Sequence, residues 1–529
     1  MAYLGAASSL AHDGRMRVPT AEWERPDSTS TLSLWPPGFP AAIALPVYFG
    51  ASPTQAARWI NIISAAVTAG AIVMLIGAPL GLPAGVVGAV VVLATQAVFD
   101  TYISVLSEPL FIALMLLFLI AMVHARDRLI LLGVLATALV MVRYAGAAAP
   151  MAAVIWMLID ARHDVRTRVR RAIAVGLIPL IALVVWFART AAAPDRHATP
   201  KLKLYGDWGA TILQARDTIA EWLAPLLPDG TVQRTLALLM VIALIVFLIT
   251  AASDTGANRL RRLRVAGVST LIAAASLFGA CYIIVILASR AFVGGTIPLD
   301  WRILAPLIVL TEIASVTAVG YWWRAYHFPV HAAILVVGIA WLGAAATATI
   351  NDAIYATTEG SDFAGANWRS SPLIAWVRAH GKGHPLYSNW PAALYFHAQR
   401  IARELPDSTD AGDISGFAAQ IRADDGYMVG FDEPSPDFIA PETLARELGL
   451  RQVVRTSDGA VWTAVPPTAT ARDSTGRDSA SAPVRKQRHA DVDGTVRGGA
   501  EEEVGVVSVA SDAHGLDRCE AGVDQRRLR

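Results

Sequence analysis

The sequence predicts a polytopic α-helical membrane protein with a small α/β domain after its last span. Three observations lead to this fold class. Hydrophobic residues make up 54% of the 529 residues, charged residues make up only 16%, and long apolar runs recur between residues 56 and 350. A soluble protein of this length carries about a quarter charged residues. Most of the runs are close to the roughly 20 residues that a helix needs to cross a bilayer.

Residues 1–55 are expected to form a first loop on the extracytoplasmic side, with an interfacial segment. This loop contains "WPPGFP", Trp35–Pro40. Proline fixes φ and pushes the preceding residue towards extended geometry, so the stretch predicts a stiff, non-helical corner. Trp35 and Phe39 suit the membrane–water interface, and on physical grounds alone the corner is an interfacial turn with aromatic anchors.

Residues 56–350 are expected to form a transmembrane bundle of about ten spans. The apolar runs lie near 56–77, 84–100, 104–123, 129–142, 144–159, 172–189, 234–251, 265–289, 302–320 and 329–349. The fourth and fifth runs are short. The sequence leaves open whether they form two tilted helices or a re-entrant pair.

Three arginine clusters set the orientation, because positive charge favours the cytoplasmic side. They occupy residues 124–128, 160–171 and 258–264. With these loops in the cytoplasm, the outer face receives residues 1–55, 100–108, 143–144, 190–233, 290–301 and everything from about 350 onward. Topology thus explains the arginine clusters, and no nucleic-acid partner is expected.

Residues 351–466 are predicted to form the extracytoplasmic α/β domain. Helical pieces are expected at 371–380, 390–398 and 441–448, strands at 384–389 and 426–433, and a closing hairpin over 451–465. Residues 467–529 are poor in aromatic residues and predict a disordered tail. Cys281 lies in an apolar run and Cys519 in the tail, so no structural disulfide is expected.

Glu108 stands out in "VLSEPLF", where Ser107 can cap a helix and Pro109 suits its first turn. The helix dipole favours a carboxylate there, so a plain capping acid is one interpretation. The membrane edge is nevertheless a costly place for a carboxylate without a partner or a task. Asp100, on the same face, is a weaker candidate.

Arg143 interrupts the apolar stretch "ATALVMVRYAGAAAP" and is followed by Tyr144. Its side chain could extend to lipid headgroups, or it could bind a phosphate through paired hydrogen bonds. Arg302 in "PLDWRILAP" presents the same two choices, and Asp300 beside it is a ready partner. Arg290 is a third candidate.

The order and spacing of these motifs, and their placement on one side of the membrane, resemble those of the GT-C superfamily of polyprenyl-phosphate-sugar-dependent glycosyltransferases. The chain looks most like bacterial relatives of the protein O-mannosyltransferases and of the lipid A aminoarabinose transferase. The resemblance covers about Tyr3 to Val465. It implies a GT-C-like helical bundle, a first outer loop with helices along the membrane, and a small extracytoplasmic domain. "WPPGFP", with Trp35, would then shape the cleft where donor and acceptor meet.

The resemblance also implies roles for single residues. Glu108 would help to hold a divalent cation or the phosphate end of the donor, and it counts as a catalytic and a metal-binding candidate. Arg302 would contact the lipid phosphate, with Arg143, Tyr144 and Arg290 as further substrate-binding candidates.

The general base of the family is an acid at the outer end of a first transmembrane helix. A stretch similar to "AYLGAASSLAHDG", Ala2–Gly14, follows it. We therefore expect that helix and its acid to lie upstream of Met1 or to be missing. Asp13 and Asp27 are the remaining candidates for the base, although Asp13 fits a turn with Gly14 better.

The expected function is inverting transfer of a sugar from a polyprenyl-phosphate carrier to an extracytoplasmic acceptor, by an enzyme of the cytoplasmic (inner) membrane. One alternative is a transporter or flippase of a lipid-linked glycan. Charged residues deep inside spans and internal repeats would favour it, and the sequence shows neither. Another alternative is an inactive relative that acts as a partner protein.

Overall fold

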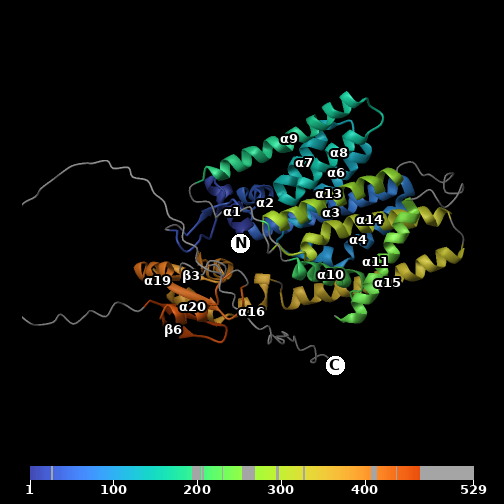
Figure 1. Cartoon of the computed structure of the whole chain (residues 1–529). Coiled ribbons are helices and arrows are strands. Elements are labelled where there is room, and N and C mark those ends of the chain that lie inside the picture. The colour runs from blue at the N-terminus through green and yellow to red at the C-terminus, as the bar shows by residue number, and fades with distance from the viewer. Residues whose placement is uncertain are drawn as a thin grey trace, which may run out of the picture. The chain divides into compact units, whose positions relative to one another are not determined.

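The computed structural model in Figure 1 describes most of the chain. The described residues are 1–25, 28–193, 204, 208–228, 230–252, 268–293, 297–325, 328–360, 362–406, 414–435 and 438–464. The predicted tail, 467–529, lies outside them. Within them a helical bundle precedes a small sheet, which confirms the predicted fold class.

All ten predicted apolar runs fall largely within helices. In chain order these are α3 (Pro53–Leu80), α4 (Leu82–Leu93) with α5 (Gln96–Ile103), α6 (Glu108–His124), α7 (Leu129–Val142), α8 (Ala148–Ile159), α9 (Val165–Ala191), α11 (Thr231–Ala252), α13 (Val268–Phe292), α14 (Trp301–Ala325) and α15 (Phe328–Thr358). Three further helices are α1 (Ala2–Asp13), α2 (Gly38–Tyr48) and α10 (Gly209–Leu223).

The chain is a multi-pass membrane protein, although fewer helices reach full spanning length than the ten runs suggested. Among the described residues, five helices are long and apolar enough to cross a membrane, namely α3, α9, α13, α14 and α15. The α4–α5 pair, bent by 70°, makes a sixth if it forms one broken span. α6, α7 and α8 are shorter. α7, for example, has 14 residues and rises about 21 Å, against about 30 Å of hydrocarbon.

The bundle is held together by one large apolar core that α3, α6, α13 and α14 share. Ile72, Phe118, Phe278 and Val309 are fully buried representatives of these helices. α6, α7, α8 and α13 lie side by side in Figure 1, and α9 packs along α7 and α8. This packing fixes the ends of α6 and α7, where the candidate site lies.

The short fourth and fifth runs are two separate helices, α7 and α8. Between them, Arg143 has an extended backbone and Tyr144–Ala147 forms a 3₁₀ turn (η1). Gly146 allows this turn to lie against the end of α7, since a Cβ atom there would come within 2.3 Å of the Leu139 carbonyl oxygen.

The first loop is a compact layer. After α1, β1 (Arg17–Val18) pairs antiparallel with β2 (Ser30–Thr31), and α2 follows from Gly38. The expectation that the whole corner Trp35–Pro40 is non-helical is therefore wrong from Gly38 onward. The fixed φ of proline also suits the first turn of a helix. Phe39 is fully buried and is not an interfacial anchor; Tyr48 and Phe49 are the strongly exposed aromatics here.

The C-terminal part contains a five-stranded sheet in the order β4-β3-β5-β7-β6. β3 runs parallel to β4 and β5, and β7 runs antiparallel to β5 and β6. The elements are α16 (Ala366–Arg369), α17 (Pro372–His380), β3 (Leu386–Ser388), α18 (Pro391–Ala393), β4 (Arg403–Glu404), α19 (Ile414–Ala423), β5 (Tyr427–Phe431), α20 (Pro441–Glu447), β6 (Arg451–Arg455) and β7 (Gly459–Thr463). The sequence did not predict β4 or α19.

One edge of this sheet contacts the first loop. The Glu404 backbone N–H donates to the Ala21 carbonyl oxygen over 2.9 Å, and the Thr20 hydroxyl donates to the Glu404 carboxylate over 3.2 Å. Trp23 packs edge-on against Phe417 of α19, with 5.5 Å between ring centroids. The first loop thus packs against the β4 edge of the sheet.

A buried polar cluster supports the same edge. Arg403 and Tyr387 both donate to the Asp424 carboxylate. Burial raises the pKa of Asp424, but hydrogen bonds from Tyr387, Gln420 and Arg403 outweigh it and leave the pKa below its usual value. Burial raises the pKa of Tyr387, and its hydrogen bond to Asp424 adds to the effect. Three donors thus meet at Asp424 Oδ2, which gives the cluster a structural role.

Gly38 gives a test of the contact between the corner and α7. A Cβ atom at Gly38 would lie 2.6 Å from the Met141 carbonyl oxygen and 2.9 Å from the Val142 nitrogen. Because backbone must move, we expect Gly38→Ala to reduce the free energy of unfolding by about 1–3 kcal/mol. Thermal unfolding of the detergent-purified protein measures this.

The matched control is Gly70→Ala in α3, where an added Cβ atom meets nothing within 4 Å. It should leave stability unchanged or raise it by up to about 1 kcal/mol. Equal effects of the two substitutions would contradict a tight contact at Gly38.

Candidate functional site

The candidate site is built around a buried ion pair between Arg143 and Glu108. Arg143 follows the last residue of α7, and its guanidinium pairs with the Glu108 carboxylate. The side chains are 14% and 4% exposed. Arg143 Nη1 also donates to the Ser107 hydroxyl over 3.2 Å. The alternative in which Arg143 extends to lipid headgroups is therefore wrong.

Glu108 is the first residue of α6, as the sequence predicted, and Pro109 follows in the first turn. Ser107 makes no side-chain capping bond to the helix, so its predicted capping role is wrong. Its hydroxyl binds Arg143 and Glu108 instead. The preceding loop is held by Asn61 of α3, whose side-chain amide donates to the carbonyl oxygens of Tyr102 (3.0 Å) and Ser104 (2.7 Å).

Two tyrosines complete the site, and sequence reasoning did not select either of them. The Tyr3 side chain hydrogen-bonds Ser107 and lies within electrostatic reach of Arg143 and Arg302. Tyr282 of α13 is within electrostatic reach of Arg143 and Asp300. Its hydroxyl donates to the Ile303 carbonyl oxygen over 3.0 Å. Tyr3 belongs to the family-like stretch Ala2–Gly14, but nothing marks Tyr282 within its apolar run.

Arg302 approaches the same site from the first turn of α14. Its Nε and Nη2 atoms donate to one Asp300 oxygen over 3.0 and 2.9 Å. The other Asp300 oxygen accepts the Ile303 N–H over 3.1 Å. The predicted pairing with Asp300 is confirmed. Because the Arg302 side chain remains 42% exposed, its other N–H donors can still meet a ligand.

Trp35 and Tyr144 lie next to these residues and help to shape the site. Trp35 packs edge-on against Tyr3, with ring centroids 6.1 Å apart. The Tyr144 hydroxyl donates to the Ser33 carbonyl oxygen over 3.3 Å and accepts a bond from the Trp186 indole over 3.0 Å. Tyr144 thus ties the first loop to α9.

Arg290 is placed differently. Its Nε and Nη2 atoms donate to the Thr211 hydroxyl over 3.0 and 2.9 Å. The guanidinium lies 5.7 Å from the centre of the Trp208 ring, and the residue is buried. These contacts tie α13 to α10 and give Arg290 a structural role.

Of the two aspartates proposed as the base, the structure describes Asp13 alone. Asp13 ends α1, and Gly14 follows in the left-handed conformation, which matches the expected turn. At 1.5 Å per residue, Asp13 is about 15 Å along the helix from Tyr3. Asp27 lies outside the described residues.

The surroundings of Glu108 do not fit a divalent cation. A guanidinium already occupies its carboxylate, whereas Mg²⁺ and Ca²⁺ prefer several oxygen ligands. In the part of the chain that the structure describes, no group of three or more His, Cys, Asp or Glu side chains could hold a metal ion.

Basic residues gather at the opposite end of α7. Arg171 donates to Asp127 over 2.7 Å, and Arg162 donates to Asp160 over 2.6 Å. The Arg162 bond is the main reason that the pKa of Asp160 falls to about 2. Arg143 and this basic cluster thus lie at the two ends of one helix. If positive charge marks the cytoplasmic side, the site lies at the outer face.

The buried ion pair of Arg143 and Glu108 leads to a prediction about stability. Glu108→Ala leaves the Arg143 guanidinium buried without its counter-charge, so we expect the free energy of unfolding to fall by about 3–5 kcal/mol. Replacing both residues by leucine should restore most of this loss, because an apolar pair needs no desolvation of charge. Denaturant unfolding of the single and double variants measures the difference.

A surface pair serves as the control. Glu442 of α20 pairs with Arg455 and its side chain is 65% exposed, so Glu442→Ala should cost less than about 1 kcal/mol. A double leucine variant that is less stable than Glu108→Ala would contradict the buried-pair account.

No family model and no curated protein sequence matches the chain. Among solved structures, ArnT from Cupriavidus metallidurans in the apo state aligns over 88% of this chain and 93% of its own, with 13% identity and a TM-score of 0.42. The same protein bound to undecaprenyl phosphate aligns over the same shares, with 12% identity and a TM-score of 0.41. The Archaeoglobus fulgidus oligosaccharyltransferase, in complex with zinc and sulfate, covers 81% of this chain and 63% of its own, with 12% identity and a TM-score of 0.43.

ArnT is the lipid A aminoarabinose transferase, and both proteins are GT-C superfamily members. Because all three TM-scores are below 0.5, we base the functional proposal on the residues of this chain.

Proposed function

We propose that the protein is an integral-membrane glycosyltransferase that moves a sugar from a polyprenyl-phosphate carrier to an extracytoplasmic acceptor. One observation carries the proposal: the guanidiniums of Arg143 and Arg302 are both within electrostatic range of Tyr3, at helix ends on the side away from the basic loops. Such an arrangement suits the phosphate of a lipid whose chain lies in the bilayer.

The arginines keep donors for a phosphate although each has a carboxylate partner. A guanidinium has five N–H donors. Arg302 uses its Nε and Nη2 on Asp300, and Arg143 uses Nη1 on Ser107 and Glu108. The remaining N–H groups match the paired geometry of phosphate oxygens. In this proposal Glu108 is a positioning residue, because it fixes the direction of Arg143.

The reaction that fits is an inverting displacement. An acceptor oxygen attacks the anomeric carbon, the bond from that carbon to the phosphate oxygen breaks, and the phosphate leaves with the electron pair. Guanidinium groups stabilise the charge that grows on the leaving phosphate. A base must take the proton of the acceptor. We propose Asp27 for this role, because Asp13 lies at the end of α1 far from Tyr3.

A substitution at Arg302 tests the binding of the polyprenyl-phosphate donor. We expect Arg302→Ala to weaken the binding of polyprenyl phosphate at least about tenfold, because charge-assisted bonds are lost. Folding should hardly change, since the side chain is 42% exposed. Binding to the protein in nanodiscs and thermal unfolding measure the two effects. Arg128→Ala, at the other end of α7, should change neither, and equal loss of binding and stability in Arg302→Ala would favour a structural role.

A substitution at Glu108 tests the rate of sugar transfer. Glu108→Gln keeps the size and a hydrogen-bonding oxygen but removes the charge that holds Arg143. We expect transfer from labelled polyprenyl-phosphate sugars to fall by about tenfold or more, as a loss of roughly 1.4 kcal/mol or more in transition-state stabilisation. The rate in washed membranes measures this, with Glu359→Gln, at an exposed acid directly after α15, as the control. A well-folded Glu108→Gln protein with full transfer activity would reject the role.

A transporter of lipid-linked glycans is the second candidate, and one observation favours it. The expectation that no charged residue lies deep inside a span is wrong, because Glu312 in the middle of α14 is only 4% exposed. Beside it, α4 and α5 are broken by 70°, as in many transporters. Movement of a labelled lipid-linked glycan across proteoliposomes without product formation would favour this function. Donor binding without transfer or transport would favour an inactive partner protein.

A further inference from the structure

Helix α10, in the connection between α9 and α11, presents a row of hydrogen-bonding side chains to the bundle. Thr211, Gln214, Thr218 and Trp222 follow one another at intervals of three or four residues, which places them on one face of the helix. Each forms a hydrogen bond to α13, to α14 or to the segment just before α14. The row thus joins α10 to the helix that carries Arg302.

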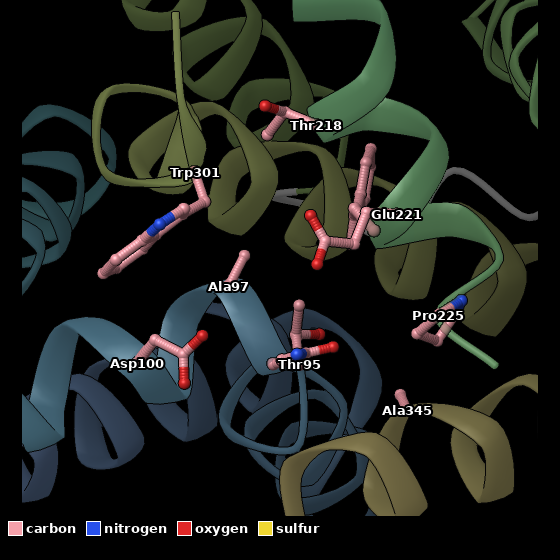
Figure 2. A pocket seen from close by; sticks show the side chains of 10 residues that line it. Thr95, Ala97, Asp100, Thr218, Glu221, Pro225, Trp301 and Ala345 are labelled. Atoms are coloured by element: carbon pink, nitrogen blue, oxygen red, sulfur yellow. The ribbon is translucent and has the colours of Figure 1, made fainter. Parts of the chain in front are cut away.

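Two members of the row hold the backbone of Leu299. The Leu299 N–H donates to Gln214 Oε1 over 3.0 Å, and the Leu299 carbonyl oxygen accepts from the Thr218 hydroxyl over 3.4 Å. Leu299 is buried and precedes α14, which begins at Trp301. Thr218 and Trp301 line one cavity, as Figure 2 shows. The middle of α10 therefore lies against the start of α14.

The other two members attach α10 towards its two ends. Arg290 of α13 donates to the Thr211 hydroxyl, and the Trp222 indole donates to Glu312 Oε1 over 3.0 Å. Arg290 and Glu312 are both buried. These two contacts keep α10 in place when a bond in its middle is removed.

The position of Leu299 determines where Asp300 lies, because Asp300 is the next residue. Asp300 Oδ1 accepts the Ile303 N–H in the first turn of α14. Asp300 Oδ2 accepts the Nε and Nη2 groups of Arg302. A displacement of Leu299 would therefore reach the Arg302 guanidinium through one peptide bond and one ion pair.

We infer that α10 positions Arg302 for the donor phosphate, with Gln214 and Thr218 as the positioning residues. The inference rests on the proposed function, since it takes the phosphate as the ligand of Arg302. Gln214 is an exposed residue, and water can replace its partner when the bond to Leu299 is removed. A purely structural role of Gln214 therefore predicts no change in donor binding, whereas a positioning role predicts a loss.

The test substitution is Gln214→Met, which keeps a long side chain of good helix propensity but removes the oxygen that accepts the Leu299 N–H. Binding of polyprenyl phosphate without a sugar is measured on the full-length protein in nanodiscs. We expect binding to weaken by about twofold to tenfold, the range for the loss of one hydrogen bond, while the Tm stays close to that of the parent. Thr218→Val loses only the longer bond and should have a smaller effect.

Hydrogen exchange gives a readout that does not depend on the donor. Peptide 297–304 should exchange faster in Gln214→Met, because the Leu299 amide loses its acceptor. Gln452→Met, the same substitution at an exposed residue of β6, is the matched control and should change neither exchange nor binding.

A combined variant shows whether the effect passes through Arg302. In an Arg302→Ala background, Gln214→Met should weaken donor binding no further, because coupled residues are not additive. The inference is overturned, and the proposed function stands, if Gln214→Met binds the phosphate like the parent, loses as much again in the Arg302→Ala background, or leaves exchange unchanged. A parent protein that binds no polyprenyl phosphate would reject the proposed function and, with it, this role of α10.

Discussion

The ion pair between Arg143 and Glu108 is the constraint on which the arrangement of the bundle at the start of α6 and the end of α7 depends. An unpaired charge in a low-dielectric interior costs several kcal/mol, so neither residue can be buried without the other. Their pairing ties the first residue of α6 to the residue after α7. Tyr3 of α1 hydrogen-bonds Ser107 beside this pair, and Tyr282 of α13 lies within electrostatic range of Arg143. Segments far apart in the sequence are thus held at one charged centre.

The bundle was largely predictable, because crossing a bilayer requires long apolar runs and these are visible in composition alone. What the sequence could not show is where each helix begins and bends. The corner at Trp35–Pro40 illustrates the limit. Its prolines predicted a non-helical corner, but only packing reveals that Gly38 begins a helix against the Met141 carbonyl. Similarly, β4 has two residues, too few for any periodicity, and it exists because the neighbouring strand supplies its partners.

The individual residues of the candidate site could be predicted from the sequence, but their spatial arrangement could not. Glu108, Arg143 and Arg302 stood out because charge at a membrane edge is costly. Their pairing depends on distances between helices, which spacing along the chain does not encode. Tyr282 carries no such signal. Glu312 was missed for a further reason: α14 has a mean hydropathy of 2.0 over its spanning window, so averaging hides a single acid. Arg290, which the sequence marked equally clearly, bonds to Thr211 of α10.

The contact between the first loop and β4 fixes the parity of the membrane crossings. The Glu404 N–H meets the Ala21 carbonyl, and Thr20 meets the same glutamate across a separation of 384 residues. Two segments that touch in water must be on one side of the bilayer, so the chain between them crosses an even number of times. The five long helices alone are an odd number. The bent α4–α5 pair must therefore complete a crossing, or an odd number of the shorter helices must do so in its place.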